Sequence, residues 1–169
     1  EYFGFAPEVI EVLVHPQSIV HALVGFRDGG VMAHLGPADM RHAIGFALHW
    51  PDRGHVPVER LDLAKLGQLT FEAPDADRFP ALRLAREVMR MRGLSGAAFN
   101  AAKEIALDHF MAGGIGFLDM AAVVESTLDG LLSETRLQKA ATDLEDVLAM
   151  DHLARVRATE HAHARQKGR

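Results

Sequence analysis

Ten histidines are the side chains of this sequence best suited to acid–base or metal chemistry near neutral pH. His15 follows an apolar stretch and precedes Pro16, which predicts a position at the end of a strand, where functional groups are often presented. His21 lies within the next apolar stretch. On local grounds, His15 fits either a functional role or a strand end capped by the histidine's own hydrogen bonds.

The spacing of four other histidines argues against a metal site. His161 and His163 are two residues apart on a predicted helix and therefore point to different faces. His42 and His49 are seven residues apart, two helical turns, which is too far to chelate one ion. We interpret all four as surface or packing residues.

A methionine and three arginines could also line a binding site. Met40 lies in the predicted first turn of a helix, where methionine is usually core filler. Arg83, Arg86 and Arg90 recur at three- and four-residue steps and could hold phosphate. A solvated helix face, with Glu87 as a local ion-pair partner, is the favoured interpretation.

The sequence contains no self-sufficient catalytic constellation. Residues 113–116 (GGIG) lack the spacing and the preceding strand of a phosphate-binding loop and are predicted to end a helix. No serine sits in a nucleophile elbow, and no carboxylates form a metal-binding cluster. The absence of cysteine excludes disulfides, zinc fingers and thiol catalysis, and it suits a reducing cytosol.

Composition predicts a folded soluble protein, either one domain or part of a larger one. The chain has 169 residues, of which 49% are hydrophobic and 24% charged, and no apolar run is long enough to span a membrane. The net charge of −5 argues against binding to nucleic acid. Residues 152–169 are the exception, and we expect their basic side chains at a solvated helix end: Arg155, Arg157, Arg165, Lys167 and Arg169.

Strand patterns are confined to residues 9–35. Three β-branched, apolar stretches predict strands over 9–14, 19–26 and 31–35, with a tight hairpin at 27–30 (RDGG). A helix is expected over 39–50, closed by Pro51. Residues 51–77 are predicted to be an irregular connector with a short helical piece over 61–66.

Helical periodicity dominates from residue 78 onward. A first helix is predicted to end at Gly93. A second is predicted to begin with Ser95 as N-cap and to stop at residues 113–114. A third stripe, the buried face of a further predicted helix, runs from Met120 to Leu131. A capping box at 142–145 (TDLE) opens a fourth helix. The predicted fold class is therefore α+β, a small mainly antiparallel sheet followed by a C-terminal four-helix bundle.

Several motifs resemble the 1-deoxy-D-xylulose-5-phosphate reductoisomerase family. They occur in the family's order between residues 10 and 104: 10–21 (IEVLVHPQSIVH), 35–41 (LGPADMR), 50–53 (WPDR), 61–63 (LDL), 69–71 (LTF), 80–85 (PALRLA) and 100–104 (NAAKE). Lys103 departs from the pattern, since the family usually has asparagine there.

The resemblance implies an NADPH-dependent enzyme that uses Mg²⁺ or Mn²⁺ and converts 1-deoxy-D-xylulose 5-phosphate to 2-C-methyl-D-erythritol 4-phosphate in non-mevalonate isoprenoid synthesis. It implies that residues 1–50 are the end of the catalytic domain, 51–77 a linker and 78–169 the helical bundle. By position, His15 and Met40 match residues that line the family's substrate and cofactor pocket. The resemblance also implies a cytoplasmic homodimer that forms through sheet edges.

The family's cofactor-binding and metal-binding motifs all precede the first strand predicted here. The chain also begins at Glu1 without an initiator methionine, so we expect a piece of a longer polypeptide. No cofactor or metal is expected to bind this piece, and alone it is expected to be inactive. The alternative is a stand-alone, non-catalytic dimerisation or interaction module.

Overall fold

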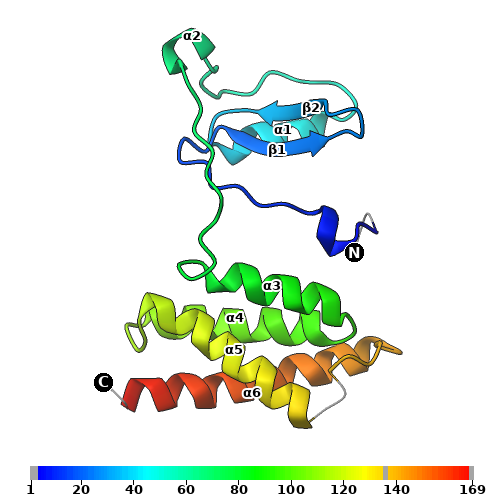
Figure 1. The fold of residues 1–169 in the computed structure, drawn as a ribbon, viewed down its shortest axis with the longest axis vertical. Helices are drawn as coiled ribbons and strands as arrows, with labels where there is room; N and C mark the ends of the chain where they lie inside the picture. The colour runs from blue at the N-terminus through cyan, green and yellow to red at the C-terminus, as the bar shows by residue number, and fades with distance from the viewer. Residues whose placement is uncertain (1–3, 135–136, 168–169) are drawn as a thin grey trace. The chain divides into compact units, whose positions relative to one another are not determined.

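The computed structural model of the chain describes residues 4–134 and 137–167 (Figure 1). Glu1, from which we expected a piece of a longer polypeptide, and Arg169 of the basic tail therefore lie outside the described residues. The elements are a 3₁₀ turn η1 (Pro7–Val9), strands β1 (Val20–Gly25) and β2 (Val31–Leu35), and helices α1 (Met40–His49), α2 (Leu63–Leu66), α3 (Pro80–Met91), α4 (Ser95–Met111), α5 (Phe117–Glu134) and α6 (Leu144–Lys167). The α+β class is confirmed.

The chain divides into two compact units. Residues 11–74 form the strand unit, and the other described residues, 4–10, 75–134 and 137–167, form the helical unit. Within the described ranges, no helix has the length and apolar character needed to cross a bilayer.

The strand unit is built on one antiparallel hairpin, as predicted for its second and third strands. In the register, Ala22 pairs with His34 and Val24 with Met32. The turn closes through a hydrogen bond from the Phe26 amide to the Gly30 carbonyl (2.8 Å). Gly29 adopts a φ of +87°, a left-handed conformation that glycine reaches without steric cost.

The prediction of a strand over residues 9–14 is wrong. Residues 7–9 form the turn η1 instead, and Val14 makes only an isolated antiparallel bridge to Glu72. Val12 and Leu13 remain 38% and 47% exposed. A strand needs a neighbouring strand for its hydrogen bonds, so β propensity alone does not create one.

Helix α1 begins and ends close to its predicted limits. The Asp39 carboxylate accepts a hydrogen bond from the Arg41 amide (2.9 Å), which caps the helix. The following segment, expected to be a connector, packs within the strand unit: Val56 lies so close to Gly45 that a Cβ there would meet it at 2.4 Å. The predicted short helix is α2, capped by the side chain of Asp62.

Helices α3, α4, α5 and α6 pack around one apolar core. Small residues allow α4 and α6 to approach each other closely, because one face of each is a fully buried alanine stripe. These stripes are Ala98, Ala101, Ala102 and Ala106 on α4, and Ala154, Ala158 and Ala162 on α6. Larger buried side chains of α5, Val123 and Leu131 among them, complete the core.

Two predicted caps differ from the observed ones. Ser95 is the first residue of α4 rather than its N-cap, and its buried hydroxyl donates to the carbonyls of Val88 (3.2 Å) and Arg92 (2.6 Å). At α6 the box is shifted by one residue: Asp143 accepts from the Asp146 amide (3.0 Å). Threonine and aspartate both accept from a helix N-terminus, so at α6 local sequence alone leaves a choice between the adjacent Thr142 and Asp143.

Candidate functional site

His15 is held between two neighbouring residues of the strand unit. It is half-buried, and its Nδ1 lies 2.8 Å from the Thr70 carbonyl oxygen. Its ring stacks on the ring of Phe71, with centroids 4.7 Å apart and planes inclined by 16°. Nε2 is buried and makes no hydrogen bond within the described part of the chain. The interpretation of His15 as a residue that caps a strand end through its own hydrogen bonds therefore accounts for Nδ1 but not for Nε2.

Residues 70–72 bind the segment around His15 at several further points. The Gln17 side chain donates from Nε2 to Thr70 Oγ1 (3.0 Å) and accepts from the Thr70 amide at Oε1 (3.2 Å). Val14 and Glu72 exchange two backbone hydrogen bonds, each 2.9 Å. The sequence showed no sign of this pairing, because the two segments are more than fifty residues apart.

Met40 is exposed at the start of α1. Its side chain is 70% exposed, so the interpretation of Met40 as core filler is wrong for this unit. Beside it, Arg41 forms a two-point ion pair with Asp39. The side-chain hydrogen bond from Arg41 lowers the pKa of Asp39 to about 2. The hydrogen-bond and ring partners of His15 do not include Met40.

Three histidines that the sequence analysis did not connect lie together in the strand unit. The rings of His21, His34 and His42 are 5.5 to 5.8 Å apart, centroid to centroid. Nε2 of His21 lies 3.1 Å from the Gly36 carbonyl oxygen. His42 is thus a packing residue, as predicted, and within the described ranges no histidines or carboxylates are grouped so as to hold a metal ion.

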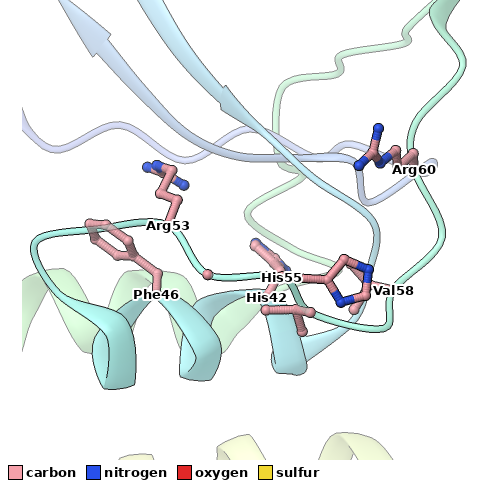
Figure 2. Close-up of a pocket in the computed structure, with 8 residues that line it drawn as sticks. His42, Phe46, Arg53, His55, Val58 and Arg60 are labelled. Carbon is pink, nitrogen blue, oxygen red and sulfur yellow. The ribbon is translucent and has the colours of Figure 1, made fainter.

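A pocket of about 470 Å³ lies between α1 and the segment that follows it (Figure 2). It is lined by His42, Phe46, Arg53, Gly54, His55, Val56, Val58 and Arg60. The Arg53 guanidinium lies over the Phe46 ring, 4.4 Å from its centroid. No carboxylate lines the pocket, so its electrostatics favour an anion, but Arg53 and Arg60 are both exposed and stand well apart in Figure 2. Such open, separated charges do not form a converging site.

The charged faces of the helical unit are occupied by ion pairs. Arg83 contacts Glu87 (2.8 Å) and Glu125, and both raise its pKa. Arg155 contacts Asp151 (2.7 Å) and Glu104 (2.6 Å), with the same effect on its pKa. The interpretation of the arginines on α3 as a solvated, locally paired face is confirmed for Arg83.

Two further histidines of the helical unit also have structural partners. The ring of His163, on α6, meets that of His109, on α4, edge to face at 5.1 Å. His163 is exposed and His161 is half-buried, in keeping with their predicted surface or packing roles.

Comparisons with known proteins agree on one family. The family model described as the DXP reductoisomerase C-terminal domain matches residues 35–157. The chain is 72% identical over its whole length to 1-deoxy-D-xylulose 5-phosphate reductoisomerase of Cereibacter sphaeroides (strain ATCC 17025), of which it covers 43%. The corresponding protein of Ruegeria sp. (strain TM1040) is 68% identical over 92% of this chain, which covers 39% of that relative.

Solved structures give the same result. The reductoisomerase from Zymomonas mobilis in complex with NADPH matches with a TM-score of 0.85 and 45% identity, over 96% of this chain and 42% of that one. A DOX-P reductoisomerase in complex with NADPH, fosmidomycin and magnesium matches with a TM-score of 0.80 and 39% identity, over 89% of this chain and 38% of that one. The chain thus spans less than half the length of the relatives it matches.

Proposed function

The chain belongs to the DXP reductoisomerase C-terminal domain family, and we propose that it is the C-terminal part of an NADPH-dependent reductoisomerase. The reaction is the conversion of 1-deoxy-D-xylulose 5-phosphate to 2-C-methyl-D-erythritol 4-phosphate in non-mevalonate isoprenoid synthesis. The observation that carries the proposal is 72% identity over all 169 residues to a named reductoisomerase. We further propose a cytoplasmic location.

NADPH and a divalent metal, magnesium or manganese, are the proposed cofactors of the whole enzyme. Similar solved reductoisomerases are complexes with NADPH, and one of them also contains magnesium. The described residues of this chain do not fit either group, because they provide no metal-binding cluster and the sequence has no phosphate-binding glycine loop. We therefore assign no reaction step to a cofactor held by this chain.

The proposed contribution of this chain is pocket wall and scaffold. In this proposal His15 and Met40 line the substrate and cofactor pocket. Residues 1–50 are the end of the catalytic domain, 51–77 are a linker of which residues 51–74 pack within the strand unit, and 78–169 are a four-helix bundle domain. The exposed strands β1 and β2 support a homodimer formed through sheet edges, because open edges readily pair with another strand.

The proposal predicts no reductoisomerase turnover from the 169-residue chain alone. Hydride transfer needs NADPH, and the charge that develops in the rearrangement needs a stabilising cation. The test is the loss of NADPH absorbance with 1-deoxy-D-xylulose 5-phosphate and Mg²⁺, first with the chain alone. Turnover by the isolated chain would contradict this part of the proposal.

A fusion tests the remaining part. The portion of the Cereibacter sphaeroides reductoisomerase that precedes its match to this chain is joined to residue 1, and the assay is repeated with and without fosmidomycin, a ligand of similar structures. We expect fosmidomycin-sensitive turnover. If circular dichroism shows that the fusion is folded but the fusion has no turnover, the result would instead support the stand-alone interaction module.

A further inference from the structure

We propose that Gln17 and Thr70 are positioning residues that hold His15 in a single tautomer, with a proton on Nδ1 and an acceptor lone pair on Nε2. The proposal rests on the proposed function for its catalytic consequence, because His15 is placed there in the pocket wall. The chemical claim about the tautomer stands on the geometry of this chain alone.

The tautomer follows from the partner of Nδ1. A backbone carbonyl oxygen can only accept a hydrogen bond, so the 2.8 Å contact with Thr70 requires a proton on Nδ1. In the neutral ring the lone pair then lies on Nε2, which is buried and unpartnered within the described residues. An N–H at Nε2 would be a buried donor without an acceptor, a costly arrangement. Both nitrogens therefore favour the same tautomer.

Gln17 fixes the carbonyl that selects this tautomer. Its side-chain amide makes hydrogen bonds with two atoms of Thr70, the hydroxyl oxygen at 3.0 Å and the backbone nitrogen at 3.2 Å. Both residues are half-buried, so water competes less with these bonds than on the surface. Loss of either side chain removes a restraint on Thr70, the residue whose carbonyl oxygen accepts from His15.

The neighbours of this contact restrict the ring itself. Phe71 stacks on one face of the His15 ring, and the backbone pair between Val14 and Glu72 anchors both segments next to it. The Ser18 amide donates to the His15 carbonyl (3.0 Å), so the following turn is held as well. Rotation of the ring would break its contacts with residues 70 and 71 together.

This arrangement gives His15 one specific task. In this tautomer Nε2 is a hydrogen-bond acceptor for an O–H or N–H donor that the described chain does not supply. Because Nε2 is buried in this chain, such a donor reaches it only when the atoms that cover it move. A substrate hydroxyl and a donor from the rest of the enzyme share this chemistry. They are distinguished in the fusion, because only a substrate donor shifts the Nε2 resonance when substrate is added.

The first experiment measures the tautomer directly in the 169-residue chain. Two-bond ¹H–¹⁵N spectra of histidine-labelled protein at neutral pH are expected to show a protonated Nδ1 and an unprotonated Nε2 for His15. Gln17→Ala and Thr70→Val are each expected to move the tautomer ratio about five-fold towards the other form, the effect of losing roughly one hydrogen bond. Thr70→Ser keeps the hydroxyl and should restore the parent spectrum.

The matched control is Gln68→Ala, which truncates an exposed glutamine of the same segment. Thermal unfolding of every variant checks the fold, and Gln17→Met, which keeps the side-chain length but neither hydrogen bond to Thr70, replaces Gln17→Ala if that variant unfolds. A protonated Nε2 in the parent chain, or an unchanged ratio in folded Gln17→Ala and Thr70→Val, overturns the proposal.

The second experiment asks whether the tautomer matters for the reaction. In the active fusion, Gln17→Ala and Thr70→Val are expected to lower kcat/KM about ten-fold, while Gln68→Ala leaves it unchanged. A changed tautomer with an unchanged kcat/KM overturns the catalytic consequence. An inactive fusion contradicts the proposed function but leaves the spectra of the isolated chain as an independent test of the positioning.

Discussion

The two units of this chain bury their residues to very different extents. In the helical unit, seventeen apolar residues form one buried core. In the strand unit, Gly36 and Gly45 are the only residues classed as buried. Apolar burial is the main source of folding free energy, so the helical unit has its own source of stability. The strand unit instead relies on hydrogen bonds and ring contacts that position side chains.

The largest expected effect is the loss of a core side chain in the helical unit. Leu131 of α5 is fully buried, whereas its neighbour Leu132 is 47% exposed. Leu131→Ala is expected to lower the free energy of unfolding by about 3 kcal/mol, because it removes buried surface and leaves a cavity. Leu132→Ala is the matched control, with an expected loss below about 0.5 kcal/mol. Urea denaturation measures both, and equal losses would contradict the described core.

The contrast between the units predicts unequal hydrogen exchange. Amides of α4 and α5 open only with the core, while those of β1 and β2 lie in a hairpin with little burial. We expect protection factors in α4 to exceed those in β1 by about a hundred-fold or more. Comparable protection in both would mean that the strand unit has a source of stability beyond the described contacts.

The alanine stripes should resist enlargement. Ala158 is fully buried on the face of α6 that carries the stripe, and Ala164 is exposed on the same helix. Ala158→Leu is expected to lower the free energy of unfolding by about 2 kcal/mol, because the leucine side chain has about three more heavy atoms than alanine and the close helix interface has no room for them. Ala164→Leu should have little effect. A tolerated Ala158→Leu, measured by thermal unfolding, would contradict close packing at this point.

The smallest effect concerns the cap of α1 in the strand unit. The Arg41 side chain lowers the pKa of Asp39 to about 2, against a reference of 3.8. Since the folded pKa is the lower one, the ion pair stabilises α1 above pH 4, and this contribution is lost as the pH falls towards 2. A carboxyl ¹³C titration should give a midpoint near 2, and Arg41→Ala should raise it. An unchanged midpoint in that variant would rule out Arg41 as the cause.

Local patterns predicted the elements that carry their own signals. The hairpin has glycines where the turn needs them, and α1 has an aspartate cap and a proline after it. The helices after residue 78 show apolar periodicity, and residues 124, 127 and 131 of the predicted third stripe are indeed buried. The failed strand over 9–14 has the right composition but no neighbouring strand in the described chain. The β propensity of residues 9–14 was therefore not sufficient to form a strand.

The environment of His15 depended on contacts that sequence spacing does not encode. Fifty-five residues separate His15 from Thr70, and the ring's tautomer depends on a carbonyl oxygen, an atom that every residue possesses. The histidines at 21, 34 and 42 likewise meet through the hairpin register and the turn into α1.

The sequence by itself determined the family, the helical periodicity and the identity of His15 as a residue of interest, since all three are properties of residue type and order. Only the tertiary structure decided which nitrogen of that histidine is engaged and which apolar stretch becomes a strand. Hydrogen bonds and strand pairing join two segments, and which segments meet is settled when the chain folds as a whole.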